Sequence, residues 1–271
     1  MASVSALADV RCQESGMTMS LHPWGHFKPG AWKLYQVVTE TYDEHGTVVN
    51  KNITYRRTTL KSADERNSVA LLSETVVEVA GKRLDTEPRT VKESLYGDAP
   101  DENQTVKKLD PAEVVVDGRK IACQVEQLES TGARGKTVTK TWYSTQMPPY
   151  VFRRETKTAD AEGKATLSET VLEVTSLHTP CELLPHITTA ARVLVVSNHP
   201  SGKTVTNAVT STEIPGGVVC HTADEFDRDG RLLRRSRLSL IEYSSEPRRE
   251  RSGLFYRIRS HRAHRLPMPE E

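Results

Sequence analysis

The sequence lacks the features by which several large classes of protein are recognised. Its longest unbroken aliphatic run covers residues 193–196, far short of the roughly 20 apolar residues that a membrane-spanning helix needs. No transmembrane segment is therefore expected. Residues 1–19 contain Asp9, Arg11 and Glu14, where a secretory signal would have a positive start and an apolar run. As written, the sequence predicts a cytoplasmic location, or the periplasm or cell envelope if a signal has been removed.

Cysteine and aromatic residues are also scarce. The four cysteines contain no CxxC pair, which argues against a zinc ribbon and a thioredoxin-like redox motif. Aromatic residues make up 6% of the chain, and few of them lie near its basic segment. Because single-stranded nucleic acid is bound by basic grooves with interleaved aromatic side chains, nucleic acid is not an expected partner.

No motif of catalysis or cofactor binding is complete. Residues 132–137 (GARGKT) look like the end of a phosphate-binding loop, but Ser130 stands where the first glycine belongs, and a strand-like segment follows where a helix is needed. The groups HxxxH (residues 22–26) and HxxCxxxxH (residues 178–186) contain residue types that bind zinc, at spacings that match no closed site. We predict no enzymatic activity, no metal and no cofactor.

What the chain does contain is thinly spread apolar sequence and an internal repeat. Apolar residues make up 36%, charged residues 27%, and the mean hydropathy is −0.53, as expected when strands alternate between core and water. Residues 135–164 recur as residues 202–231 with eleven identities in thirty aligned positions, where average composition gives about two. The repeat is therefore interpreted as an internal duplication.

Each copy of the duplication has the pattern of successive hairpins. In the first copy, Gly135 supplies a turn before the alternating segment KTVTKTW, Pro148 ends that strand, and a DxxG turn from Asp160 to Gly163 follows the next one. The same residue types stand 67 positions later. A further DxxG at residues 43–46 suggests a fainter third unit in the N-terminal third of the chain.

The pattern as a whole predicts an all-β protein with about fourteen strands. We expect a long antiparallel meander that forms a curved open half-barrel or two similar sheets. An irregular N-terminal segment (residues 1–28) precedes the duplicated β-domain (residues 29–260), and residues 261–271 form a flexible tail. Sub-boundaries or long loops are expected near residues 97–111 and 178–187, which are polar and rich in turn-forming residues. The strands outside the repeat are expected at residues 32–42, 47–60, 69–79, 90–96, 113–116, 121–128, 189–196 and 254–258.

Two surfaces are candidates for binding. Alternation places apolar side chains of both copies on one face, where they could hold an apolar, lipid-like ligand or a partner segment: Val138, Trp142, Val151, Val205, Val209 and Val218. The second surface is basic, because residues 228–265 contain twelve arginines against four carboxylates, a net +8 that leaves −7 for the rest of the chain. Its arginines could contact an acidic partner or pair with carboxylates of the same protein; the principal ones are Arg231, Arg234, Arg235, Arg237, Arg257 and Arg259.

One stretch resembles a known family. Residues 113–172 contain EVVVDG, a strand with Cys123, a charged turn, the segment KTWYS before a proline, another strand, a DxxG turn and Leu172. This series looks like the curved antiparallel half-barrels of the LolA/LolB lipoprotein-carrier superfamily and their uncharacterised envelope relatives. The resemblance implies that the concave face of the sheet holds an acyl chain or another apolar partner and that no residue does chemistry. In contrast to that family, the sequence has no evident plug helix.

Overall fold

The structure is a computed structural model that describes residues 17–64, 68–95, 104–132, 135–180 and 190–247. The expected strand at residues 254–258, the arginines Arg257 and Arg259, and the C-terminal tail lie outside the described residues.

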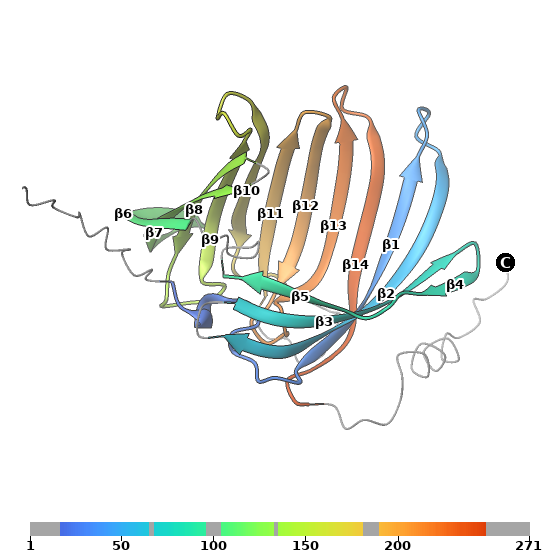
Figure 1. The fold of residues 1–271 in the computed structure, drawn as a ribbon, viewed down its shortest axis with the longest axis horizontal. Coiled ribbons are helices and arrows are strands. Elements are labelled where there is room, and N and C mark those ends of the chain that lie inside the picture. The colour runs from blue at the N-terminus through green and yellow to red at the C-terminus, as the bar shows by residue number, and fades with distance from the viewer. Residues whose placement is uncertain (1–16, 65–67, 96–103, 133–134, 181–189, 248–271) are drawn as a thin grey trace, which may run out of the picture.

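The described chain consists of strands and one short 3₁₀-helix, which confirms the predicted all-β class (Figure 1). The elements are η1 (Met19–Leu21), β1 (Trp32–Tyr42), β2 (Val48–Asp64), β3 (Ser68–Val79), β4 (Lys82–Asp85), β5 (Arg89–Ser94), β6 (Gln104–Val116), β7 (Arg119–Gly132), β8 (Gly135–Tyr143), β9 (Val151–Ala159), β10 (Thr166–Ser176), β11 (Ala191–His199), β12 (Gly202–Thr210), β13 (Val218–Asp227) and β14 (Leu232–Ser244). Among these residues no helix is long and apolar enough to cross a membrane.

All the strands belong to one antiparallel sheet that is curved and open. Its order is β4-β3-β2-β1-β14-β13-β12-β11-β10-β9-β8-β7-β6, and β5 pairs with β3 beside β4. The meander therefore consists of two runs, β1 to β5 and β6 to β14, joined where β1 pairs with β14. The edges of the sheet come from the middle of the chain, and β1 and β14, near the two ends of the described chain, pair with each other inside the sheet (Figure 1).

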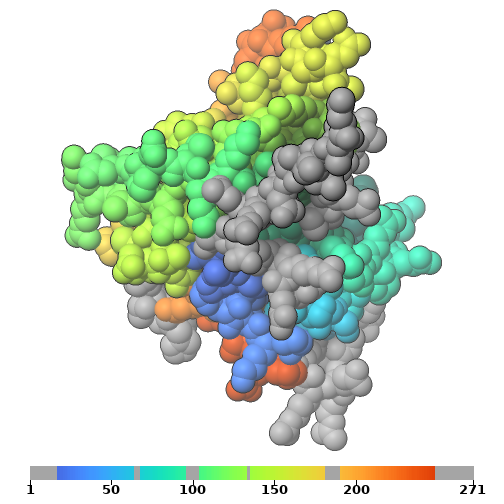
Figure 2. All heavy atoms as spheres, turned by 60° about the vertical axis from the view of Figure 1, so that its left-hand side comes forward, coloured from blue at the N-terminus to red at the C-terminus, as the bar shows by residue number. Residues whose placement is uncertain are grey.

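The sheet coils until its two halves face each other across a concave side. Strand β5, at one end of the sheet, reaches β9 in the other half, where Nη2 of Arg154 donates a hydrogen bond of 3.2 Å to the carbonyl oxygen of Leu95. Residues 17–30 occupy the space between the two halves, and Met17, Leu21 and Trp24 are buried there. In Figure 2 this segment, in blue, lies between the green strands and the cyan strands. The N-terminal segment is thus part of the core.

The predicted DxxG turns are confirmed at all three places. In each turn the glycine N–H donates to the aspartate carbonyl, at 3.1 Å for Gly46, 3.0 Å for Gly163 and 3.2 Å for Gly230. The aspartate side chain also accepts from the backbone N–H four residues later. Each turn joins two neighbouring strands of the sheet: β1 to β2, β9 to β10, and β13 to β14.

The two aligned segments of the repeat also have equivalent loops before β9 and β13. The N–H of Ser144 donates to the carbonyl of Tyr150 at 2.8 Å, and its counterpart Ser211 donates to Gly217 at 2.7 Å. At Gly135 and Gly202 a side chain is excluded, because a Cβ atom would lie 2.0 Å from a carbonyl oxygen of the next strand in both cases. These glycines therefore allow close backbone approach as well as the turn that the sequence predicts.

The long loop expected at residues 97–111 is shorter than predicted on its C-terminal side. Strand β6 already begins at Gln104, and a register shift between Leu109 and Ala112 accommodates the Asp110-Pro111 pair. Proline is tolerated there because β6 is an edge strand, whose outer side needs no backbone donor. The polar residues from Gln104 onward, which suggested a loop, belong to β6, the exposed edge strand of the sheet. The short strand β4 was not predicted.

Candidate functional site

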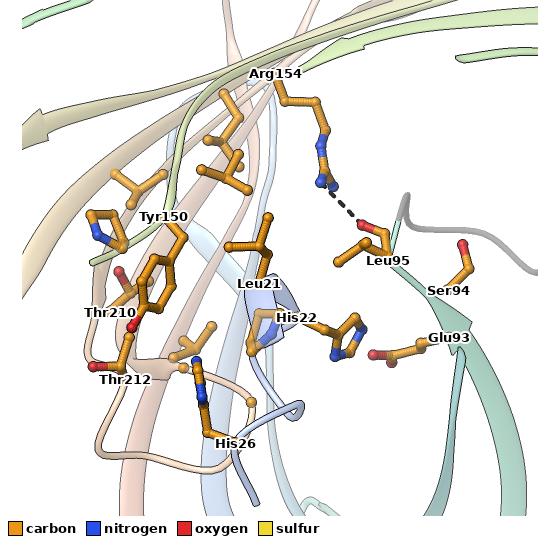
Figure 3. A pocket seen from close by; sticks show the side chains of 18 of the residues that line it. Leu21, His22, His26, Glu93, Ser94, Leu95, Tyr150, Arg154, Thr210 and Thr212 are labelled. Atoms are coloured by element: carbon orange, nitrogen blue, oxygen red, sulfur yellow. Dashed lines mark hydrogen bonds between the residues drawn. The ribbon is translucent and has the colours of Figure 1, made fainter. Parts of the chain in front are cut away.

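The main cavity lies on the concave side of the sheet and has a volume of about 560 Å³ (Figure 3). Strands β9 to β13 form one wall with Val151, Leu172, Val193 and Val218. Strand β5 forms the opposite wall from Val91 to Leu95, and the N-terminal segment fills the space between them from Leu21 to His26. The cavity is therefore enclosed by parts of the chain that are far apart in sequence.

The six apolar residues predicted to share one face do not do so. Residues paired across strands, and residues two apart in a strand, point to the same side of a sheet. By this criterion Val151 and Val218, which pair with Tyr143 and Thr210, lie on the concave face and line the cavity. The other four, which line no part of this cavity, lie on the convex face: Val138, Trp142, Val205 and Val209.

A β-bulge in each copy of the repeat explains this correction. The register shifts between Trp142 and Tyr143 in the β8–β9 pair, and between Val209 and Thr210 in the β12–β13 pair. An extra residue in one strand changes which side chains face the core. The alternation that holds within β8 and β12 therefore does not continue across the loop into the following strand. The extra residues, Phe152 and its counterpart Val219, are both fully buried.

Trp142 lines a separate recess of about 230 Å³, together with Arg153, Glu173 and Val174. Its ring centre is 4.7 Å from Nζ of Lys140 and 5.3 Å from Cζ of Arg153. Arg153 also forms ion pairs with Glu155 at 2.6 Å and Glu173 at 3.0 Å. Trp142 is therefore bordered by two cations, and it also packs against the apolar cluster that contains Phe152 and Val193. It lines no part of the main cavity.

Polar groups converge at the end of the main cavity between β5 and β9. His22 points toward Glu93 there, and Arg154 approaches from the other wall (Figure 3). The Nδ1 atom of His22 accepts a hydrogen bond of 3.2 Å from the N–H of Trp24, so its proton is placed on Nε2. Burial, with a contribution from Arg154, lowers the pKa of His22 to about 4. The ring is therefore neutral near pH 7 and presents an N–H donor.

A buried lysine lies next to this polar end. Nζ of Lys33 donates to the carbonyl oxygen of Gly216 at 3.3 Å and lies 5.4 Å from the ring centre of Trp24. Burial lowers the pKa of Lys33 to about 8, and Glu93 opposes this shift. The pKa of Glu93 is in turn raised by burial, against the attraction of Lys33. The attraction between the two groups therefore offsets part of the cost of burying each charge.

The histidine groups noted in the sequence do not form a metal site in the part of the chain that the structure describes. His22 and His26 both line the cavity, but His26 packs against Tyr150 with ring centres 5.5 Å apart. No cluster of three His, Cys, Asp or Glu side chains with metal-binding geometry occurs among the described residues. Of the group at residues 178–186, only His178 lies within them.

Four described arginines of the basic surface have carboxylate partners within the protein, whereas Arg228 donates to the carbonyl oxygen of Pro200. Arg231 pairs with Asp227 at 2.8 Å, Arg235 with Asp224 at 2.6 Å, Arg237 with Glu40 at 3.1 Å, and Arg234 with Glu225. Arg235 donates through two nitrogens to both oxygens of Asp224. These contacts match the alternative in which the arginines pair with carboxylates of the same chain.

Sequence reasoning missed most of the cavity wall. It assigned the N-terminal segment to irregular structure and did not include β5 or Leu172 and Val193 in the site. The apolar residues Met17, Leu21, Trp24 and Phe27 stand out in an otherwise polar stretch, and this was the signal available for a buried segment. Which wall they pack against depends on contacts between distant parts of the chain.

Comparisons with known proteins add no relative. No protein-family model matches the chain, and no curated protein and no solved structure matches it significantly.

Proposed function

We propose that this protein binds a small molecule with an apolar body, which occupies the cavity on the concave side of the sheet. The observation that carries this proposal is the cavity itself, with its volume of about 560 Å³ and its wall of aliphatic side chains from β9 to β13. Ligand sites in proteins are typically preformed cavities of about 300–1,000 Å³, lined by apolar residues with a few convergent polar groups.

The polar end of the cavity supports the same interpretation. The Nε2–H of neutral His22 and the guanidinium of Arg154 can donate, and the carboxyl of Glu93 can accept. A ligand whose apolar body covers Leu172 and Val193 would gain about 25 cal/mol for each Å² of apolar surface removed from water. The polar groups would then set its orientation.

Both aligned segments of the repeat contribute to the site in the same way. The loop before β9 supplies Pro149 and Val151, and the equivalent loop before β13 supplies Gly216 and Val218. We propose that this arrangement, a curved open sheet with an apolar interior, serves the carrier-like role that the resemblance to the LolA/LolB superfamily implies. No step of chemistry is part of this proposal.

The test is a fluorescence titration with the neutral apolar probe N-phenyl-1-naphthylamine. We expect saturable binding to the intact protein and a loss of at least about tenfold in affinity for Val218→Trp, because an indole ring there would fill part of the cavity. The matched control is Val205→Trp, which places the same ring on the convex face of the neighbouring strand. Circular dichroism and thermal melts would verify that both variants are folded.

Equal binding by wild type and Val218→Trp would remove the cavity from consideration, and a loss confined to Val205→Trp would move the site to the convex face. The basic surface receives no comparable support, because Arg231, Arg234, Arg235 and Arg237 are already paired with carboxylates.

A further inference from the structure

Above the cavity, the concave face carries an unbroken row of hydroxyl side chains. One residue from each of five neighbouring strands, β8 to β12, belongs to this row, and each is paired directly with the next: Thr139, Thr156, Thr170, Ser197 and Thr204. We call these five residues the hydroxyl belt. Directly paired residues point to the same side of a sheet, so all five lie on the concave face. Thr139 is buried there, and the other four are partly exposed.

The hydroxyl belt continues the cavity wall along the strands. Thr156 lies two residues beyond Arg154 on β9, and Thr170 lies two residues from Leu172 on β10. Arg154 and Leu172 both line the cavity. Since residues two apart in a strand share a face, a ligand seated on Leu172 reaches the belt by extending one residue pair along the sheet. In Figure 1 the upper halves of β10 to β14 stand clear of β3 and β5.

The belt has capacity for further hydrogen bonds. The hydroxyls of Thr139 and Thr156 are 3.2 Å apart, and those of Thr170 and Ser197 are 2.8 Å apart. A hydroxyl has one donor and two acceptor positions, so each pair uses one donor and one acceptor and keeps one donor and three acceptors. These hydroxyls are suited to a partner that both donates and accepts.

No charged residue belongs to the row between β8 and β12. The charged residues next to the belt along these strands alternate with it and point to the convex face: Lys140, Glu155, Lys157, Glu169 and Lys203. Beyond β12 the row continues with Glu225 and Arg234, which form an ion pair with each other. A charged ligand group over the belt itself would lose its hydration without an opposite charge in the row. An anionic head group would instead be drawn to Arg154, which lies on the same face two residues from Thr156.

From this arrangement we infer that the ligand is a neutral amphiphile with a polyhydroxylated head group, of the alkyl glycoside or glycolipid type. Its apolar chain occupies the cavity and its head group lies on the hydroxyl belt. This inference rests on the proposed function, because the cavity must first hold the chain.

The test compares ligands that share one alkyl chain. Isothermal titration calorimetry below the micelle concentration would use octyl-β-D-glucoside, 1-octanol and octyl sulfate. We expect octyl glucoside to bind at least about fivefold more tightly than either of the other two, because only its head group can exchange several hydrogen bonds with the belt.

Removal of single hydroxyls tests the position of the head group. Thr170→Val and Thr156→Val keep the side-chain shape, and each should weaken octyl glucoside about threefold to tenfold while leaving 1-octanol unchanged. The matched control is Thr222→Val, which removes a hydroxyl from the convex face, where Thr222 pairs with Asn207 and Arg237. It should change neither ligand.

The outcomes separate the two proposals. If none of the three ligands binds, the proposed function fails. If 1-octanol binds and octyl glucoside is no tighter, or if the belt variants leave the glucoside unaffected, the cavity is retained and the head-group inference is overturned. Tighter binding of octyl sulfate would also overturn it and would assign the head group to Arg154.

Discussion

Replacing Lys33 with methionine is expected to remove a specific pH dependence of stability. Lys33 is 9% exposed and lies against the ring of Trp24, with one hydrogen bond to the carbonyl of Gly216. Burial lowers its pKa from 10.5 to about 8. The folded protein therefore releases this proton at a lower pH than the unfolded chain does.

The sign and size of the effect follow from that difference. Between pH 8 and 10.5 the unfolded state binds more protons than the folded state, so the free energy of unfolding rises with pH in this window. One pKa unit corresponds to 1.36 kcal/mol, so the wild type should gain about 3 kcal/mol from Lys33 across the whole window. Below about pH 8 the lysine is charged in both states and the full cost of burying that charge is present.

The assay is urea denaturation at pH 7, 8, 9 and 10, followed by tryptophan fluorescence. From pH 7 to pH 10 the free energy of unfolding of the wild type should rise by about 2–3 kcal/mol relative to that of Lys33→Met. For the exposed Lys61→Met the corresponding difference should stay constant. A constant difference for Lys33→Met as well would refute the reasoning, since it would mean that Lys33 is solvated in the folded state.

Three further predictions concern the cavity, the repeat and the core. Acidification from pH 6.5 to 4 should destabilise the wild type by up to about 3 kcal/mol more than His22→Gln. The pKa of His22 is lowered in the folded state, so the unfolded chain takes up the proton first as the pH falls. Denaturation curves at both pH values test this. Gly202→Ala should lower the melting temperature far more than Gly163→Ala, since a Cβ at Gly202 would lie 2.0 Å from a carbonyl oxygen whereas Gly163 has open space; equal shifts would contradict the close approach. Phe152→Ala should cost about 3–5 kcal/mol in chemical denaturation, compared with under about 0.5 kcal/mol for the exposed Val115→Ala, and a loss below about 1 kcal/mol would show that Phe152 is not a core residue.

The features predicted well from the sequence are those with local causes. The strand Trp32–Tyr42 matches its expected bounds, and the DxxG turns form as predicted, because an aspartate side chain and a glycine with positive φ determine such a turn within a few residues. The same holds for the GKT segment, which begins strand β8 and has no helix after it.

The features that were missed depend on contacts between distant residues. The pairing of β1 with β14 joins residues about 200 positions apart, and no local pattern encodes it. The bulges at Phe152 and Val219 change which face Val151 and Val218 occupy. These two residues therefore line the cavity, and Trp142, with which strict alternation had grouped them, does not. Burial of the N-terminal segment likewise depends on a surface formed only once the sheet has coiled.

The most direct test of the account is a crystal structure of the protein with an alkyl ligand that carries a heavy atom, such as 8-bromo-1-octanol. We expect an anomalous bromine peak inside the cavity, within van der Waals distance of Val151, Leu172, Val193 or Val218. Bromine density on the convex face near Trp142, or none in the cavity under saturating ligand, would contradict it.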